Sequence, residues 1–238
     1  MKVIYIKKKY LYISLILLVL LMCWYFSNRQ TITTLYLPIT NKVIGIDPGH
    51  GGIDPGAVGK NVISENEINL SICLKLKRFI EQSGGVVVIT RDDTRGLYTD
   101  KSNSVRDKKT EDLKNRMELI NSSNCDIFLT IHLNSFPQSK YYGAQTFYSE
   151  KCSDSWRLAN VVQEELKNIL DTDNKRKPQK RDDVYLLQEA HMPSILIECG
   201  FLSNPREELL LSDEEYQEKI AWAIYIGIIK YLNERDFG

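Results

Sequence analysis

The stretch Val43-Ile-Gly-Ile-Asp-Pro-Gly-His50-Gly-Gly52 contains the clearest local signals in this 238-residue chain. Its apolar start, Val43–Ile46, predicts a short buried strand. The Asp-Pro-Gly-His-Gly-Gly run that follows predicts a loop, because proline and clustered glycines do not continue a strand. Glycines allow such a loop to bend sharply and to lie close to a ligand, although a plain turn between a strand and a helix would also use them.

Downstream of this loop, strand and helix patterns alternate. Helical periodicity predicts helices over 64–82, 113–121, 155–170 and 213–232. Apolar and β-branched runs predict strands over 86–90, 126–131, 144–148 and 194–198. The segments 92–112 and 171–183 are charged and polar, and we expect loops there. This alternation predicts a single α/β domain over residues 42–235, in which helices flank a mostly parallel twisted sheet.

The N-terminus has a different composition. Lys2, Lys7, Lys8 and Lys9 precede an uncharged, largely apolar run over 11–26. This run predicts an N-terminal hydrophobic helix within residues 1–26, which acts as a signal peptide or a signal anchor. The lysines would remain in the cytoplasm and the domain would lie outside. No small-residue cleavage site follows, which favours an uncleaved anchor, and residues 27–41 are expected to form a linker.

Charge and cysteine content argue against some classes of protein. Residues 1–30 hold five basic residues and no acidic one, which leaves 26 basic and 31 acidic residues in the rest of the chain. A mildly acidic body argues against nucleic acid as a partner, because a phosphate backbone requires a basic face. The five cysteines show no C-x-x-C pair and no disulfide spacing. We therefore expect small buried thiols and no disulfide framework.

Two of the three histidines follow predicted strands. His50 comes after 43–46 and His132 after 126–131. Functional groups gather at the carboxyl ends of the strands in open α/β sheets, so these two side chains could converge on a metal. A catalytic zinc site has three protein ligands and one open position, and a third ligand is therefore needed. Glu65 and Glu67 are the nearby candidates.

Helix capping distinguishes the two glutamates. Ser64-Glu-Asn-Glu67 has the form of a capping box, in which Glu67 would bond back to the amide of Ser64. Glu65 would then stand at the first helical position, free to face the strand ends. The alternative is that Glu65 only interacts with the helix dipole.

Glu198 closes the apolar run 194–198, where a carboxylate is costly unless it is paired or catalytic. It could accept a proton from a water that a metal activates. The alternative is a structural salt bridge.

Five blocks follow one another along the chain: Ile44–Ala57, Glu65–Leu70, Thr90-Arg91, Leu129–Asn134 and Ile197–Asn204. In residue types and in order they resemble the zinc-dependent N-acetylmuramoyl-L-alanine amidases, over nearly the whole exported body. The resemblance implies that His50, Glu65 and His132 bind Zn²⁺, that Glu198 is the catalytic carboxylate, and that Asn134 helps to orient the substrate. His191 lies on no family motif, and we expect it to be structural or at the surface.

The chain looks most like the germination-specific members of this family in spore formers, because one hydrophobic segment precedes a single domain without cell-wall-binding repeats. This likeness implies that it cleaves the amide between N-acetylmuramic acid and L-alanine in peptidoglycan, as the first step of muramic-δ-lactam formation. The protein would act on the outer face of the membrane, in the cell wall or in the spore cortex, with an accessory activator protein as a further expected partner.

The segment 92–112 is longer and more charged than its usual counterpart in the family. It could be a solvated loop, a regulatory flap or a docking surface. Two alternative functions remain open from the sequence. One is a zinc carboxypeptidase or endopeptidase that cuts peptide bonds in the stem. The other is a peptidoglycan-binding module that is inactive without a partner.

Overall fold

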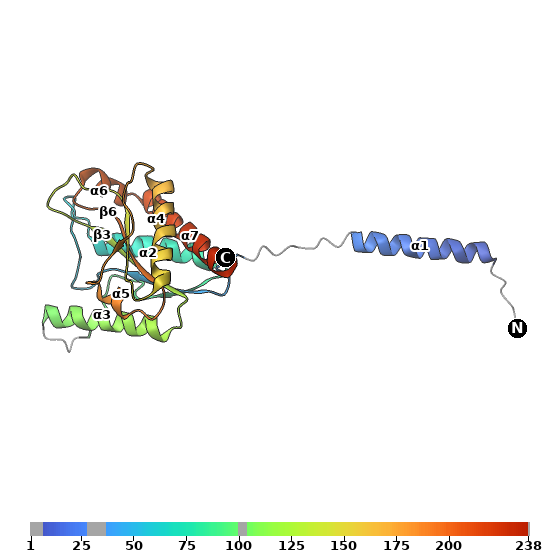
Figure 1. Cartoon of the computed structure of the whole chain (residues 1–238), viewed down its shortest axis with the longest axis horizontal. Helices are drawn as coiled ribbons and strands as arrows, with labels where there is room; N and C mark the ends of the chain where they lie inside the picture. Colours follow the sequence, from blue (N-terminus) through green and yellow to red (C-terminus); the bar gives the residue numbers. More distant parts are fainter. Residues whose placement is uncertain (1–6, 28–36, 100–103, 238) are drawn as a thin grey trace. The chain divides into compact units, whose positions relative to one another are not determined.

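The computed structural model describes residues 7–27, 37–99 and 104–237, and the chain divides into two compact units (Figure 1). The smaller unit, within residues 1–36, contains helix α1 (Lys8–Ser27), which coincides with most of the predicted hydrophobic helix. Among the described residues, no helix has both the length and the apolar character needed to cross a membrane. Most of the predicted linker, 28–36, lies outside the described residues.

The larger unit, residues 37–238, is built on one six-stranded sheet with the strand order β2-β1-β3-β6-β4-β5. Neighbouring strands are parallel except β4 and β6, which are antiparallel. The predicted α/β class and the mostly parallel sheet are therefore confirmed. The strands are β1 (Val43–Pro48), β2 (Val86–Ile89), β3 (Ile127–Asn134), β4 (Gln145–Tyr148), β5 (Gln179–Lys180) and β6 (Ser194–Phe201).

Helices cover both faces of this sheet, because its central strands are apolar on both sides. Leu129 and Ile131 belong to a large core with α2, α4, α6 and α7, whereas Phe128 packs into a smaller core with α3 and α5. In Figure 1, α3 and the short α5 lie next to each other at the lower side of this unit. The helices are α2 (Glu65–Gln82), α3 (Val105–Ser122), α4 (Ser153–Leu170), α5 (Tyr185–Glu189), α6 (Pro205–Leu211) and α7 (Glu214–Phe237).

The segment 92–112 differs from its prediction as a loop, because α3 already begins at Val105. The side chain of Ser104 accepts a hydrogen bond from the amide of Asp107 and caps this helix. Most residues in its first two turns are polar and exposed, so the apolar periodicity that was used to find helices is missing there. The short elements β5, α5 and α6 were also not predicted.

The cysteines of the larger unit agree with the expectation of small apolar residues. Cys73, Cys125 and Cys199 are buried, Cys152 is half-buried, and none of the described cysteines forms a disulfide. Burial raises the pKa of the Cys199 thiol well above its usual value. These side chains therefore act as packing groups, as small buried thiols usually do.

A buried ion pair lies where β1 reaches the site. Asp47 is fully buried and accepts hydrogen bonds from Arg116 at 2.7 Å and from Thr90 and Thr130 at 2.6 Å each. Burial alone would raise the pKa of Asp47, but Arg116 and the two hydroxyls hold it at about 2. Because Arg116 lies on α3, these contacts tie strands β1 and β3 to that helix. Arg116 also donates to Asp112 of the same helix at 2.6 Å.

Asp47→Asn tests this pair, because it leaves the buried charge of Arg116 without its main partner. We expect the free energy of unfolding at pH 7 to fall by about 3–5 kcal/mol, as when one partner of a buried ion pair is removed. A carboxylate with a lowered pKa stabilises the fold above its unfolded-state pKa, near 4, and loses this effect as the pH falls through its folded-state value. The difference in the free energy of unfolding between the wild type and Asp47→Asn, measured by denaturant titration, should thus shrink as the pH falls from about 4 to about 2.

Asp92→Asn is the matched control, since Asp92 is an exposed carboxylate on the loop that follows β2. Its effect should stay within about 0.5 kcal/mol. Equal stability of the wild type and Asp47→Asn at pH 7 would contradict a structural role for the pair.

Candidate metal centre and active site

Two buried arginines fix the loop that follows β1. Arg91 donates to the carbonyl oxygens of Pro48, Gly49 and His50 at 2.8–3.0 Å, and Arg116 donates to those of Pro48 and His50 at 2.6–2.8 Å. His50 adopts a left-handed backbone conformation with φ 64°, which a non-glycine residue rarely adopts. Such strain persists only where the surroundings hold it, and here the arginines hold the carbonyl of the strained residue itself.

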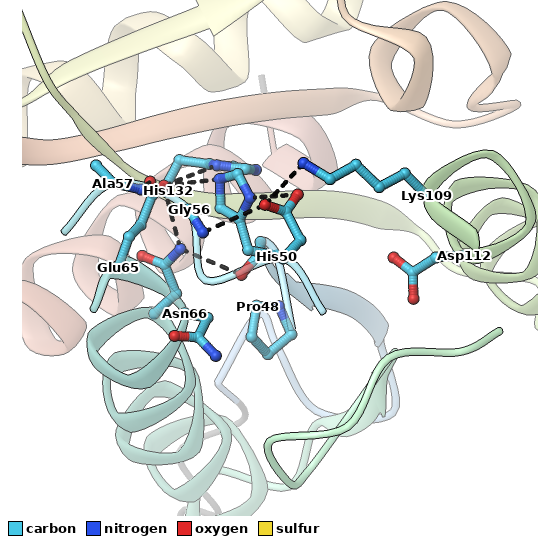
Figure 2. Close-up of polar contacts among 12 residues, drawn as sticks. Pro48, His50, Gly56, Ala57, Glu65, Asn66, Lys109, Asp112 and His132 are labelled. Atoms are coloured by element: carbon cyan, nitrogen blue, oxygen red, sulfur yellow. Dashed lines mark hydrogen bonds and ion pairs between the residues drawn. The ribbon is translucent and has the colours of Figure 1, made fainter. Parts of the chain in front are cut away.

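Three side chains from separate elements converge beside this loop. The Oε1 atom of Glu65 lies 3.2 Å from Nε2 of His50 and 3.1 Å from Nδ1 of His132. The ligand atoms of all three residues lie within 4.8 Å of one another (Figure 2). Two imidazole nitrogens and one carboxylate that face a common point form a donor set suited to zinc. The structure thus brings together the three residues named from the sequence.

Glu65 is held by the backbone as well as by the histidines. Its Oε1 accepts from the amide of Leu133 and its Oε2 from the amide of Ala57, both at 2.9 Å. Burial would raise the pKa of Glu65, but its bonds to His132 and His50 hold it well below the usual range. Glu65 is the first residue of α2, as expected, and it is 3% exposed. A role limited to the helix dipole does not account for these contacts.

The capping box was wrong as the reason for this placement. Ser64 is the N-cap residue of α2, but its side chain makes no capping hydrogen bond. The start of α2 is instead paired with the preceding loop, because the amides of Glu65 and Asn66 donate to the carbonyls of Ala57 and Pro55. The loop that carries His50 therefore also orients the helix that carries Glu65.

Asp54 was not identified from the sequence, although it lies four residues after His50 in the same block. Its Oδ2 is 3.0 Å from Nδ1 of His50, and its Oδ1 is 2.9 Å from Nζ of Lys109 on α3. A carboxylate at Nδ1 keeps a proton on that nitrogen and leaves Nε2 free to bind a metal. Burial would lower the pKa of His50, but Asp54 and Glu65 raise it to about 9. A proton therefore competes with a metal for this imidazole.

His132 lies against the backbone of Gly49. A Cβ atom at position 49 would fall 2.3 Å from Cε1 and Nε2 of His132. Only glycine leaves room for the ring at this close approach. Gly49 also accepts a hydrogen bond from Asn69 of α2 through its carbonyl oxygen, at 3.3 Å. Because Gly49 directly precedes His50 and packs against the ring of His132, it fixes these two metal-ligand candidates relative to each other.

Glu198 lies next to this cluster on the neighbouring strand. It is directly paired with His132 in the register of β3 and β6, so both side chains point to the same face of the sheet. Glu198 is 8% exposed, and its Oε2 atom has no hydrogen-bond partner. Burial raises its pKa, against the attraction of His132. The described residues include no ion pair to Glu198, so the structural salt bridge is not the reason for this buried carboxylate.

The structure also gives the positions of Asn134 and of the third histidine, His191. Asn134 ends β3, two residues after His132 and beyond a bulge, and its side chain is half-buried. His191 is exposed, and its amide donates to Asn121. The prediction that His191 lies at the surface is confirmed. Arg91 stands in one of the five sequence blocks and Arg116 in none of them, and their role in holding the His50 loop depends on tertiary contacts.

Comparisons with known proteins agree with this geometry. The family model described as N-acetylmuramoyl-L-alanine amidase (Amidase_3) matches residues 44–230. The germination-specific N-acetylmuramoyl-L-alanine amidase of Bacillus subtilis is 37% identical over 223 residues, which cover 94% of this chain and 93% of that protein.

Solved structures give the same result. The CwlD amidase of Clostridioides difficile, solved in complex with the GerS lipoprotein, is 57% identical, with a TM-score of 0.80 over 82% of this chain and all of that chain. An N-acetylmuramoyl-L-alanine amidase of Clostridium difficile 630 is 33% identical, with a TM-score of 0.71 over 82% of this chain and 99% of that chain. The chain therefore belongs to the N-acetylmuramoyl-L-alanine amidase family.

Proposed function

We propose that this amidase is zinc-dependent, that His50, Glu65 and His132 hold the metal, and that Glu198 is its catalytic carboxylate. The observation that carries the proposal is the arrangement around Glu65, whose Oε1 atom faces one nitrogen of each histidine at 3.1–3.2 Å. Three ligands from two histidines and a glutamate are a common catalytic zinc set. Zinc bound there would act as a Lewis acid, which stabilises negative charge on the scissile carbonyl and makes water nucleophilic near neutral pH.

The protein groups supply the proton transfers. Glu198 would take a proton from the attacking water at its unpartnered Oε2 atom and then deliver a proton to the departing amine of L-alanine. A carboxylate whose pKa is raised by burial is suited to both steps, because its pKa lies closer to the operating pH. The bond that breaks joins the lactyl carbonyl of N-acetylmuramic acid to L-alanine, and no covalent enzyme intermediate is required. Asn134, on the same strand as His132, would orient the substrate.

A role in the spore cortex follows from the relatives. The B. subtilis protein is named germination-specific, and the C. difficile protein is a CwlD amidase. We infer that this chain strips peptide stems from muramic acid as the first step of muramic-δ-lactam formation. A zinc carboxypeptidase or endopeptidase would instead release amino acids or peptides by cutting within or between the stems, so the products distinguish the two.

The N-terminal segment is proposed to direct export, as a signal peptide or a signal anchor. Four lysines precede its uncharged run, which is the charge distribution of a segment whose start stays in the cytoplasm. The mass of the protein recovered from spore-forming cells tests this. A mature protein that lacks the segment indicates a signal peptide, and an intact chain in the membrane fraction indicates an anchor. An intact chain in the cytosol would contradict export.

An accessory protein is proposed because the 57% identical CwlD amidase was solved in complex with a lipoprotein, GerS. The lipoprotein counterpart from the same organism as this chain is the candidate partner. Size-exclusion chromatography of the two purified proteins should show one complex, and two separate peaks at micromolar concentration would contradict the proposal.

Glu198→Gln keeps the shape of the side chain but removes its capacity to accept a proton. We expect hydrolysis of purified peptidoglycan to fall by about 10²–10⁴-fold, while zinc binding remains. Mass spectrometry of the products from the zinc-loaded wild type should show free stems that begin with L-alanine. Glu118→Gln, at an exposed carboxylate of α3, is the control and should retain activity. Stems released in full by Glu198→Gln would exclude its catalytic role.

Asp54→Ala tests the positioning of His50. Removal of the group that holds Nδ1 should weaken zinc binding by about 10–100-fold, as for other residues that support a metal-binding histidine. Competition with a chromophoric chelator measures the affinity directly, without reference to activity. Asp92→Ala should bind zinc as the wild type does. Unchanged affinity in Asp54→Ala would mean that the arginines alone position His50.

A further inference from the structure

A basic groove lies beside the active site and has no part in the mechanism described above. It has a volume of about 280 Å³ and is lined by residues 140–142 and 174–176, which include Lys140, Lys175 and Arg176. Both lysines are exposed and Arg176 is half-buried. Within the described part of the chain, none of the three forms an ion pair with a carboxylate. A basic surface without ion pairs, in a mildly acidic domain, is suited to an anionic ligand.

Arg176 is held in place by neutral groups. Its Nε donates to the carbonyl of Tyr142 and its Nη1 to Oε1 of Gln145, both at 2.7 Å. The guanidinium carbon lies 4.5 Å from the centre of the Phe201 ring. The nearby carboxylate of Glu207 accepts from the amides of Gly143 and Phe201, outside ion-pair distance of Arg176. The arginine is therefore positioned without an ion pair, and Glu207 attracts its charge only from a distance.

The sheet connects Arg176 to the reacting groups. Gln145, which binds Arg176, is paired with Glu198 in the register of β4 and β6, and Glu198 is paired with His132 on β3. Directly paired residues project from the same face of a sheet. Gln145, Glu198 and His132 thus form a row across three strands, which leads from the basic groove to the metal-ligand candidates.

A second hollow, lined by His50 and His132 themselves, has a different character. A cavity of about 180 Å³ lies between the His50 loop and α3, with Ile53, Leu113 and Leu186 in its walls. Its charged residues are paired: Lys109 with Asp54 at 2.9 Å, and Arg116 with Asp112 at 2.6 Å. Figure 2 shows Lys109 and Asp112 on the same side of His50. This side offers apolar surface and compensated charge.

The substrate has the matching asymmetry, if the proposed function holds. Its N-acetylated glycan is neutral around the scissile amide, whereas its peptide stem carries free carboxylates. We propose that the basic groove binds carboxylates of the peptide stem, and that the glycan lies on the α3 side of the metal centre. Arg176 is then a specificity-determining residue that favours acidic stems over amidated ones.

The test uses two soluble substrates: a disaccharide with a peptide stem whose carboxylates are free, and the same compound with those groups converted to carboxamides. With the full-length, zinc-loaded wild type, KM should be roughly 10-fold or more higher for the amidated compound, because hydrogen bonds to charged groups are lost. Arg176→Gln should raise KM for the acidic substrate by a similar factor and leave KM for the amidated one within about 2-fold. In both cases kcat should change little.

A second variant tests the groove in case Arg176→Gln does not fold. Lys140→Gln/Lys175→Gln changes only exposed side chains and should produce the same selective rise in KM, with a smaller amplitude. Arg176→Lys should restore part of the preference for the acidic substrate. Lys219→Gln, at an exposed lysine of α7, is the matched control and should behave as the wild type does.

Equal KM values for the two substrates in the wild type, or an equal rise for both substrates in the variants, would overturn the proposal. Failure of the proposed function is distinguishable. In that case the zinc-loaded wild type cleaves neither substrate, and calorimetry with the free stem peptide still tests the groove. Tighter binding of the acidic stem than of the amidated stem, lost in Arg176→Gln, would then support it, and equal binding would refute it.

Discussion

Asp47 and Arg116 form an ion pair that is closed to solvent, near the end of the interior strand β1. An isolated charge at this depth would be strongly destabilising, so each side chain is retained only with the other in place. Arg116 uses its remaining donors on the backbone carbonyls of Pro48 and His50, and Arg91, in the loop after β2, donates to the same carbonyls. The buried arginines, and the carboxylate of Asp47 that pairs with Arg116, thus determine the conformation of the His50 loop.

The metal-ligand candidates come from three elements: the loop after β1, the first turn of α2, and the end of β3. None of these segments could bring two of the ligands together alone, because they are distant in the sequence. The parallel register of β1 and β3 places the ends of both strands at one edge of the sheet. The first turn of α2 is bonded to residues 55–57 and to Leu133. The site therefore forms only when the sheet and this helix are assembled.

Much of the fold could be predicted from the sequence, because its signals are local. Apolar runs that end in polar residues predicted the central strands, and the two histidines after those runs predicted one edge of the sheet as the site. The contacts of Lys109, Arg116 and Asp54 could not be predicted, since they depend on where α3 packs. The first half of α3 was missed because its exposed turns lack an apolar stripe. Glu65 faces the two histidines as expected, but the capping argument for this placement is wrong, since backbone amides from elsewhere in the chain also hold its carboxylate.

Strand β4 runs antiparallel to β6, and this direction decides which of its flanking segments reaches the edge of the sheet that carries the candidate active site. Parallel strands contribute only the loops that follow them to this edge, which is why His50 and the residues after β3 and β6 are found there. Since β4 runs the other way, it contributes the segment before it, residues 135–144, which includes Lys140 and Tyr141. This segment joins two strands whose register is set by their neighbours. Changes in its length or composition could therefore retune which polymers the enzyme accepts without moving a metal ligand.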